Sequence, residues 1–245
     1  MSFARIDGRA EVADFGGGAI ASNAGALLGP ADRAIRLVDR FAACFSGGRM
    51  PGRVSHDVAT LVGQRAFGVA LGYEDLVDHD DLRRDPALGA ALGRIEARRS
   101  GLAPLAGKST LNRLEHAPTG RDRYRRIGHD PSAIEALSVE PFLDTHEKPP
   151  ARITLDLDAT DDPIHGHQEG RFFHGYHDGY CYLPLRIFCG DHLLAAKLRR
   201  ANIDSGAGAT DEVARIVAQT RTRWPRVKNP APRRPYPCRP RPGRG

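Results

Sequence analysis

Two aspartates, Asp156 and Asp158, are the residues whose type and spacing point most directly to chemistry. They belong to the segment 153–158, in which apolar side chains alternate with threonine and aspartate. Because alternation with a period of two is typical of a β-strand, both carboxylates are predicted to lie on one face of a strand, about 6.6 Å apart along it. Two ionised carboxylates at that spacing repel each other. A hard divalent cation such as Mg²⁺ or Mn²⁺, which prefers oxygen ligands, would relieve the repulsion.

A solvated turn and a calcium-binding loop are the other interpretations of this acidic segment. Acidic residues often end a strand only because the turn is solvated, and the Asp-Asp-Pro sequence at 161–163 has that character. A calcium loop that starts at Asp156 is excluded by two positions. Its sixth residue would be Asp161, where glycine is required, and its twelfth would be His167, where glutamate is required.

The basic charge of the chain is concentrated at its C-terminal end. The sequence pI is about 9.4, but the last twenty residues hold seven of the 36 basic residues and none of the 30 acidic ones. The first 225 residues therefore contain 29 basic residues against 30 acidic ones. Only local basic clusters can support an interaction of the body of the chain with nucleic acid.

Length and composition limit the class of protein. A chain of 245 residues allows one large domain or two small ones with a real hydrophobic core. It has no apolar run of about eighteen residues and no signal-peptide core at its N-terminus, so we expect no membrane association. Its four cysteines are scattered without a CxxC pair, which favours a reducing cytoplasm over a disulfide scaffold.

The first half of the chain is predicted to be mainly helical. Apolar residues recur at helical spacing in five segments, at 30–46, 55–71 (capped by Ser55), 87–97, 109–115 and 134–142. The acidic run 74–85 is interpreted as the caps and first turns of short helices, with Leu76 and Leu82 packed inward. The segment 11–20 could form part of a hairpin.

A local basic segment, 94–126, is the candidate DNA-binding region. It holds nine lysines and arginines against three acids, and the short helix predicted at 109–115 lies in its middle. Small polar residues at a helix start, with an arginine one turn later, suit contacts to a DNA backbone or base edge. The alternative is a basic helix that faces solvent. The candidate DNA contacts are Lys108, Ser109, Thr110, Arg113, Arg121 and Arg123.

The second half of the chain changes to strand-like composition, and we place a domain boundary after residue 148. Strands are predicted at 153–158, 179–189 and 193–198, followed by a helix at 210–224. Pro184 inside the second strand indicates an edge position or a bulge. The tail 226–245 is rich in arginine and proline, has no apolar pattern, and is predicted to be disordered.

Histidines concentrate between the first two of these strands, which suggests zinc chemistry as a rival interpretation. The set comprises His165, His167, His174 and His177, with Cys181 nearby. Imidazole and thiolate are the ligands that zinc prefers. A zinc-binding module is therefore an alternative to the carboxylate site.

Several motifs, in order, resemble the DDE transposases of bacterial insertion sequences, in the branch called the group 1 DDE domain. The resemblance covers roughly residues 10–225. The matching segments are 65–76, 78–80, 82–86, 109–115, 155–162, the His-Gly-His-Gln of 165–168, 180–185 and 198–202.

The resemblance implies an RNase H-like catalytic fold, in which three acidic residues hold two divalent metals that activate water and then a DNA 3′-hydroxyl. By the match to Asp-x-Thr, the first acid is Asp158, with Asp156 as the alternative because it shares the same face. Thr160, His165, Gly166 and Gln168 are expected to be structural residues near it, with Gly166 and Gln168 shaping the turn beside the site. The expected fold is α+β: a mainly helical region at 1–148 for DNA binding and assembly, an incomplete three-stranded RNase H-like sheet plus helix at 149–225, and the tail at 226–245.

One departure from the family changes the expectation for activity. The family places its second acid on a strand just after the helix that ends near Trp224, whereas this chain continues into the tail. The sequence therefore suggests a truncated copy, inactive alone, of a cytoplasmic, nucleoid-associated bacterial enzyme that uses Mg²⁺ or Mn²⁺. The alternative is a non-catalytic fragment that binds transposon-end DNA and pairs with itself or with full-length transposase as an inhibitor.

Overall fold

The computed structural model describes residues 25–48, 52, 54–94, 104–120 and 126–228. The chain divides into two compact units, Met1–Pro131 and Ser132–Gly245, and each is considered by itself. The segments 11–20 and 226–245 of the sequence analysis lie outside the described residues, except for Arg226, Val227 and Lys228.

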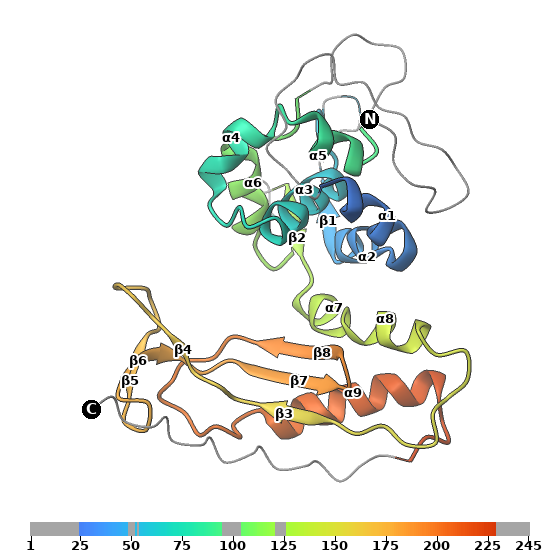
Figure 1. The fold of residues 1–245 in the computed structure, drawn as a ribbon, viewed down its shortest axis with the longest axis vertical. Coiled ribbons are helices and arrows are strands. Elements are labelled where there is room, and N and C mark those ends of the chain that lie inside the picture. The colour runs from blue at the N-terminus through green and yellow to red at the C-terminus, as the bar shows by residue number, and fades with distance from the viewer. Residues whose placement is uncertain (1–24, 49–51, 53, 95–103, 121–125, 229–245) are drawn as a thin grey trace. The chain divides into compact units, whose positions relative to one another are not determined.

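The first unit consists of short helices and one two-stranded antiparallel sheet (Figure 1). Its elements are α1 (Gly25–Ile35), α2 (Leu37–Ala43), β1 (Phe45–Gly47), α3 (Val58–Ala70), η2 (Leu76–Asp78), α4 (His79–Leu82), α5 (Pro86–Ala91), α6 (Lys108–Glu115) and β2 (Ile127–His129). This agrees with the mainly helical first half that the sequence predicts.

The single helix predicted over 30–46 is two helices. Arg36 separates them in the left-handed conformation (φ 54, ψ 38), which a residue other than glycine adopts rarely. The carboxylate Oδ1 of Asp32 accepts a hydrogen bond from the backbone N–H of Val38 at 2.8 Å, so one donor at the start of α2 is satisfied. Pro30 lies inside α1 rather than in its first turn.

Side-chain caps and close helix packing build the rest of this unit. Asp57, not the predicted Ser55, caps α3 and accepts from the backbone N–H of Thr60 at 2.7 Å. Gly29 in α1 lies so close to α5 that an added Cβ would be 2.7 Å from the carbonyl oxygen of Ala91. The two buried apolar clusters of the unit are centred on Leu61, Val62, Leu111 and Leu114, and on Phe67, Leu82, Leu88 and Leu105.

The second unit contains two three-stranded antiparallel sheets and three helices (Figure 1). Its elements are α7 (Pro131–Ala136), α8 (Val139–Asp144), β3 (Asp156–Asp158), β4 (Asp162–Pro163), β5 (Phe172–His174), β6 (Gly179–Tyr182), β7 (Leu185–Cys189), β8 (His192–Lys197) and α9 (Ala209–Arg223). The larger sheet has the order β3-β7-β8, and the smaller one β4-β6-β5.

One face of the larger sheet is the core of this unit. Leu155, Ile187 and Leu194 are fully buried and form one cluster with Phe142 of α8 and Ile216 of α9. The period-two pattern of the sequence therefore identified the buried side of β3 correctly. The helices cover that side, and the opposite side of the sheet carries the residues of the other parity.

The strand predicted over 179–189 is two strands in two different sheets. β6 pairs with β4 and β5, whereas β7 pairs with β3 and β8. Pro184 lies between them, where its missing N–H interrupts the ladder. β4 and β5, which the sequence analysis did not predict, complete the smaller sheet.

The division between the units falls earlier in the chain than the boundary predicted after residue 148. Helices α7 and α8 belong almost wholly to the second unit. The reason lies in α8, whose Val139, Phe142 and Leu143 are buried in the sheet core. Apolar periodicity predicted one helix over 134–142, where the structure has the end of α7 and most of α8, and it could not show which core they join.

Candidate functional site

The two candidate aspartates lie on the side of β3 that faces away from the core. Asp156 is exposed and Asp158 is half-buried, whereas Leu157 between them packs against the core cluster. β3 is the edge strand of its sheet, so only β7 pairs with it along these residues. The structure thus places both carboxylates on one accessible face of the leading strand of the sheet.

Two groups of Thr160 and the guanidinium of Arg186 lie next to the Asp158 carboxylate. Its Oδ1 accepts hydrogen bonds from the backbone N–H of Thr160 at 3.0 Å and from the Thr160 hydroxyl. Arg186 lies directly opposite on β7, and its Nη1 is 3.8 Å from Oδ2 of Asp158. Both side chains are about two-fifths exposed, so the pair is solvated and a cation could displace the guanidinium at small cost.

The donor atoms at this face suit a hard divalent cation, but their number is small. Carboxylate oxygens of Asp156 and Asp158 are the ligands that Mg²⁺ and Mn²⁺ prefer. In the described part of the chain, no group of three or more histidine, cysteine, aspartate or glutamate side chains is arranged to hold a metal. The face therefore offers two carboxylates, and the guanidinium of Arg186 lies beside the carboxylate of Asp158.

The turn after β4 requires its glycine. Gly166 has φ 131, a conformation that side chains with a Cβ rarely adopt, and an added Cβ would be 3.2 Å from Oε1 of Gln168. Its carbonyl oxygen also accepts a hydrogen bond from Arg171. The predicted turn-shaping role of Gly166 and Gln168 fits this geometry, while His165 is exposed.

The histidines considered as zinc ligands are organised differently from a zinc site. The rings of His174 and His177 are 4.7 Å apart, and Nδ1 of His177 is 3.2 Å from Oδ1 of Asp161. Burial, and then the charges of Asp161 and Asp162, raise the pKa of the Cys181 thiol, which disfavours the thiolate that zinc binds. These contacts suit a packed hairpin rather than a closed zinc centre.

Helix α6 presents a polar stripe in the first unit. Leu111 and Leu114 are buried in the core. The exposed residues of α6 are Lys108, Ser109, Asn112, Arg113 and Glu115, the last paired with Arg65; Thr110 is half-buried, and the exposed His116 caps the helix end. Of the six candidate DNA contacts, α6 therefore brings Lys108, Ser109 and Arg113 to one face. Arg121 and Arg123 lie outside the described residues.

Lys108 also has a structural role that the sequence did not reveal. Oδ1 of Asp80 accepts a hydrogen bond from the Lys108 backbone N–H at 3.0 Å, and its Oδ2 is 3.4 Å from Nζ. The backbone hydrogen bond is the main reason that the pKa of Asp80 is lowered. Asp75 and Asp85 cap η2 and α5 in the same way, so the interpretation of 74–85 as helix caps is confirmed.

Sequence reasoning missed two charged groups in the second unit. Arg186 could not be paired with Asp158 without the register of β3 against β7. Glu212 in α9 is buried and accepts from Nζ of Lys197 at 2.7 Å and from Nε of Arg215 at 3.0 Å. Its place in an acidic first helical turn resembled an ordinary solvated helix start, so no sequence signal distinguished it.

The chain after α9 returns to the open edge of the larger sheet. Lys228 forms an isolated parallel bridge with Arg152, four residues before β3 begins, and Val227 is buried in the sheet core. The edge on which Asp156 and Asp158 lie is therefore the place where a further strand could join the sheet.

Comparison with known proteins gives one result. The family model described as Transposase DDE domain group 1 matches residues 3–229. No curated protein and no solved structure gives a significant match. In the residues that the structure describes, none of the helices has the length and apolar character needed to cross a membrane. The match spans both units, including the strand that carries Asp156 and Asp158, and on this basis the chain belongs to the DDE transposase family.

Proposed function

We propose that this protein acts in DNA transposition, with the first unit holding transposon-end DNA and the second unit contributing carboxylates to a metal centre that cuts and joins phosphodiesters. The observation that carries the proposal is the pair Asp156 and Asp158 on the accessible face of the leading strand. An RNase H-like arrangement, in which further strands extend the sheet beyond β3, is part of the proposal.

Asp158 is the proposed primary metal ligand and Asp156 the second. When bound, Mg²⁺ or Mn²⁺ would lower the pKa of a bound water and stabilise the negative charge that develops at the phosphorus. The chain's own contribution is orientation. Thr160 donates to one oxygen of Asp158, and Arg186 lies 3.8 Å from the other, where a cation would compete with it.

Two carboxylates do not complete a two-metal centre of the kind that the family resemblance implies. We therefore expect the described residues to bind a divalent ion without cleaving DNA on their own, and further acidic ligands to come from another segment or another chain. Strand cleavage of duplex DNA with transposon ends, in the presence of Mg²⁺, checks this. Cleavage that Asp158→Asn abolishes would show that the centre is complete.

DNA recognition is proposed for the exposed stripe of α6, with Ser109 and Arg113 as its central contacts. Gel-shift titrations should compare a duplex that carries the terminal repeat with a shuffled duplex of equal length. We expect preference for the repeat, a steep decrease of affinity with salt, and a loss of roughly tenfold in Arg113→Glu. Arg84→Glu, an exposed charge reversal elsewhere in the first unit, is the matched control. Equal affinity for both duplexes would contradict the proposal.

The second candidate function is a non-catalytic regulator that binds transposon ends and pairs with its own copies or with an intact transposase. The pairing of Arg186 with Asp158 favours it, because the charge of the first carboxylate is already compensated within the chain. Inhibition of a transposition assay by the added protein would support it. If the Arg113→Glu variant inhibits the assay as strongly as the wild type, DNA binding is not the basis of the inhibition.

A further inference from the structure

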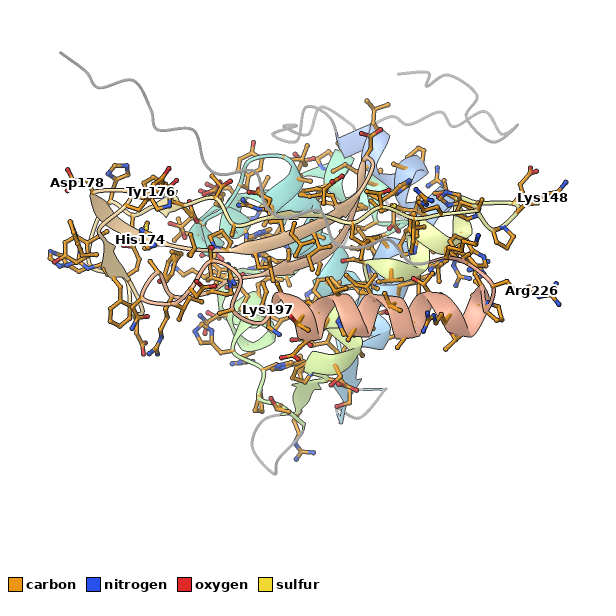
Figure 2. The ribbon with its side chains drawn as sticks, turned by 90° about the horizontal axis from the view of Figure 1, so that it is seen from below. Lys148, His174, Tyr176, Asp178, Lys197 and Arg226 are labelled. Carbon is orange, nitrogen blue, oxygen red and sulfur yellow. The ribbon has the colours of Figure 1, made fainter. Side chains whose placement is uncertain are left out.

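The exposed aromatic side chains of the described residues all lie in one hairpin. They are Phe173, Tyr176 and Tyr180, with exposed fractions of 54%, 61% and 50%. The hairpin consists of β5, β6 and the turn between them, where Asp178 adopts the left-handed conformation (φ 49). Figure 2 shows Tyr176 and Asp178 together at the hairpin tip, at the opposite end of the second unit from Lys148 and Arg226.

The rings are arranged as a platform rather than as scattered surface residues. Phe173 is directly opposite Tyr180 in the ladder, and the two ring centroids are 5.7 Å apart in a T-shaped contact. The guanidinium of Arg171 lies over the Tyr180 ring, 4.6 Å from its centroid, and also hydrogen bonds to Nδ1 of His167 at 2.8 Å. The buried Cys181 and the half-buried Phe172 are on the other face, so the platform does not belong to the local core.

The pairing register relates the platform to the carboxylate face of β3. Asp158 is opposite Arg186 and Asp162 is opposite Tyr182, so the pairing register is the same on both sides of the break at Pro184. Residues of one parity stay buried across the break, as Cys181, Leu183 and Ile187 show. Tyr180, Asp158 and Asp162 therefore share one parity in this register, in two separate sheets with the buried Pro184 between them. By this register Tyr180 lies six residues along from Asp158, at most about 20 Å away.

We propose that Phe173, Tyr180 and Arg171 form a stacking platform for unstacked bases of a DNA strand whose phosphodiester lies near Asp158; this inference rests on the proposed function. Planar rings with a stacked guanidinium suit the π-face of any base. The segment 159–184 carries four acidic residues against one arginine, so the platform does not attract phosphates. Its contribution to DNA affinity therefore comes from stacking and is independent of salt.

The test measures fluorescence anisotropy of the full-length chain with a short single-stranded oligonucleotide and with its duplex, at low and at moderate salt. The double variant Phe173→Ala/Tyr180→Ala should bind the single strand roughly tenfold more weakly at both salt concentrations, with duplex binding unchanged. Phe173→Tyr/Tyr180→Phe keeps the rings and should bind like the wild type. Leu198→Ala removes an equally exposed apolar side chain of the same unit and should have no effect.

Each other outcome decides against the platform. Single-strand affinity within twofold of wild type in the double variant would overturn it, as would absence of single-strand binding by the wild type, or an equal loss in Leu198→Ala. Self-association that the double variant abolishes in sedimentation velocity would assign the hairpin to a second copy of the chain instead. If duplex binding is normal and removal of the rings leaves single-strand affinity unchanged, only this inference is contradicted. If the protein shows no preference for the terminal repeat, the proposed function is contradicted.

Discussion

At the residue scale, Arg186 is the side chain that would compete with a cation for the proposed carboxylate site. Its guanidinium is 3.8 Å from Asp158 and competes for the same charge. Arg186→Gln should tighten Mn²⁺ binding by up to about fivefold, because a solvated ion pair of this kind is worth about 1 kcal/mol or less. Titration of Mn²⁺ followed by electron paramagnetic resonance measures this. Arg221→Gln, on the exposed side of α9, is the control. Weaker binding in Arg186→Gln would mean that the arginine helps to hold the site.

His79 is the residue from which we predict acid sensitivity of the first unit. It is fully buried, its Nδ1 is 3.3 Å from Nε2 of Gln64, and its Nε2 has no hydrogen-bond partner among the described residues. Burial, and then the charge of Arg65, lower its pKa. Below about pH 6.5 the unfolded chain binds a proton that folded His79 does not, so stability falls as the pH decreases, by up to about 1.4 kcal/mol per pH unit from this group.

The measurement is urea unfolding, followed by circular dichroism, at about pH 7.5 and about pH 5.5. Wild type should lose more stability between the two pH values than His79→Gln, which cannot take up the proton. His116→Gln, an exposed histidine at the C-terminal end of α6, should keep the wild-type pH dependence. If His79→Gln shows the same loss as wild type, the histidine is not the acid-sensitive group.

At the scale of elements, α9 is anchored to the sheet by an ion pair between the buried Glu212 and the exposed Lys197. Burial opposes the charged form of Glu212, but hydrogen bonds from Lys197 and Arg215 outweigh it, so the pKa of Glu212 is lowered. This contribution to stability is present above the unfolded pKa and is lost as the pH falls through the lower folded pKa. Glu135 of α7 is 3.3 Å from the same Lys197 Nζ, so one lysine connects α7, β8 and α9.

Glu212→Gln should therefore destabilise the protein by about 2 kcal/mol at neutral pH, because the charged hydrogen bonds are lost while the side-chain size is kept. Asp211→Asn, the exposed neighbour in the same helical turn, should change the free energy of unfolding by less than about 0.5 kcal/mol. Denaturation followed by the fluorescence of Trp224, which packs in the same core, reports on this unit. Equal effects of the two variants would contradict the anchoring role.

The elements also show which parts of the fold could be predicted. Alternation at 153–158 predicted the buried side of β3 because period-two burial is a local property of the strand. The break at Arg36 could not be predicted, since no glycine or asparagine marks it and the hydrogen bond from Val38 to Asp32 stabilises it. The division of 179–189 into β6 and β7 depends on pairing with β4 and β3, which lie elsewhere in the chain.

The same limit applies to the candidate site. The shared face of Asp156 and Asp158 follows from their spacing, so the sequence was sufficient for it. The positions of Arg186 opposite Asp158 and of Tyr180 opposite Phe173 follow from the antiparallel register, which is set by long-range pairing. The aromatic platform could therefore not be predicted from the sequence without the pairing of β5 with β6.

At the scale of the whole molecule, the two compact units predict a clean division of the chain. A fragment of residues 132–228 keeps α8, whose Phe142 and Leu143 complete the sheet core, whereas a fragment of residues 149–228 lacks them. We expect the longer fragment to unfold cooperatively and the shorter one to lack a stable fold, because it exposes the apolar face beneath α8. Thermal denaturation followed by circular dichroism compares them. Cooperative unfolding of the shorter fragment would move the boundary to the position predicted from sequence.

The central claim is that the accessible face of β3 binds a divalent cation through Asp158 and Asp156. The most direct test is Mn²⁺ binding to the full-length protein, measured by electron paramagnetic resonance, in wild type and in Asp158→Asn, Asp156→Asn and Asp191→Asn, the last an exposed aspartate in the turn between β7 and β8. The account predicts binding that Asp158→Asn weakens roughly tenfold or more, Asp156→Asn weakens less, and Asp191→Asn leaves unchanged. Wild-type binding that neither β3 variant alters, or no binding at all, would contradict it.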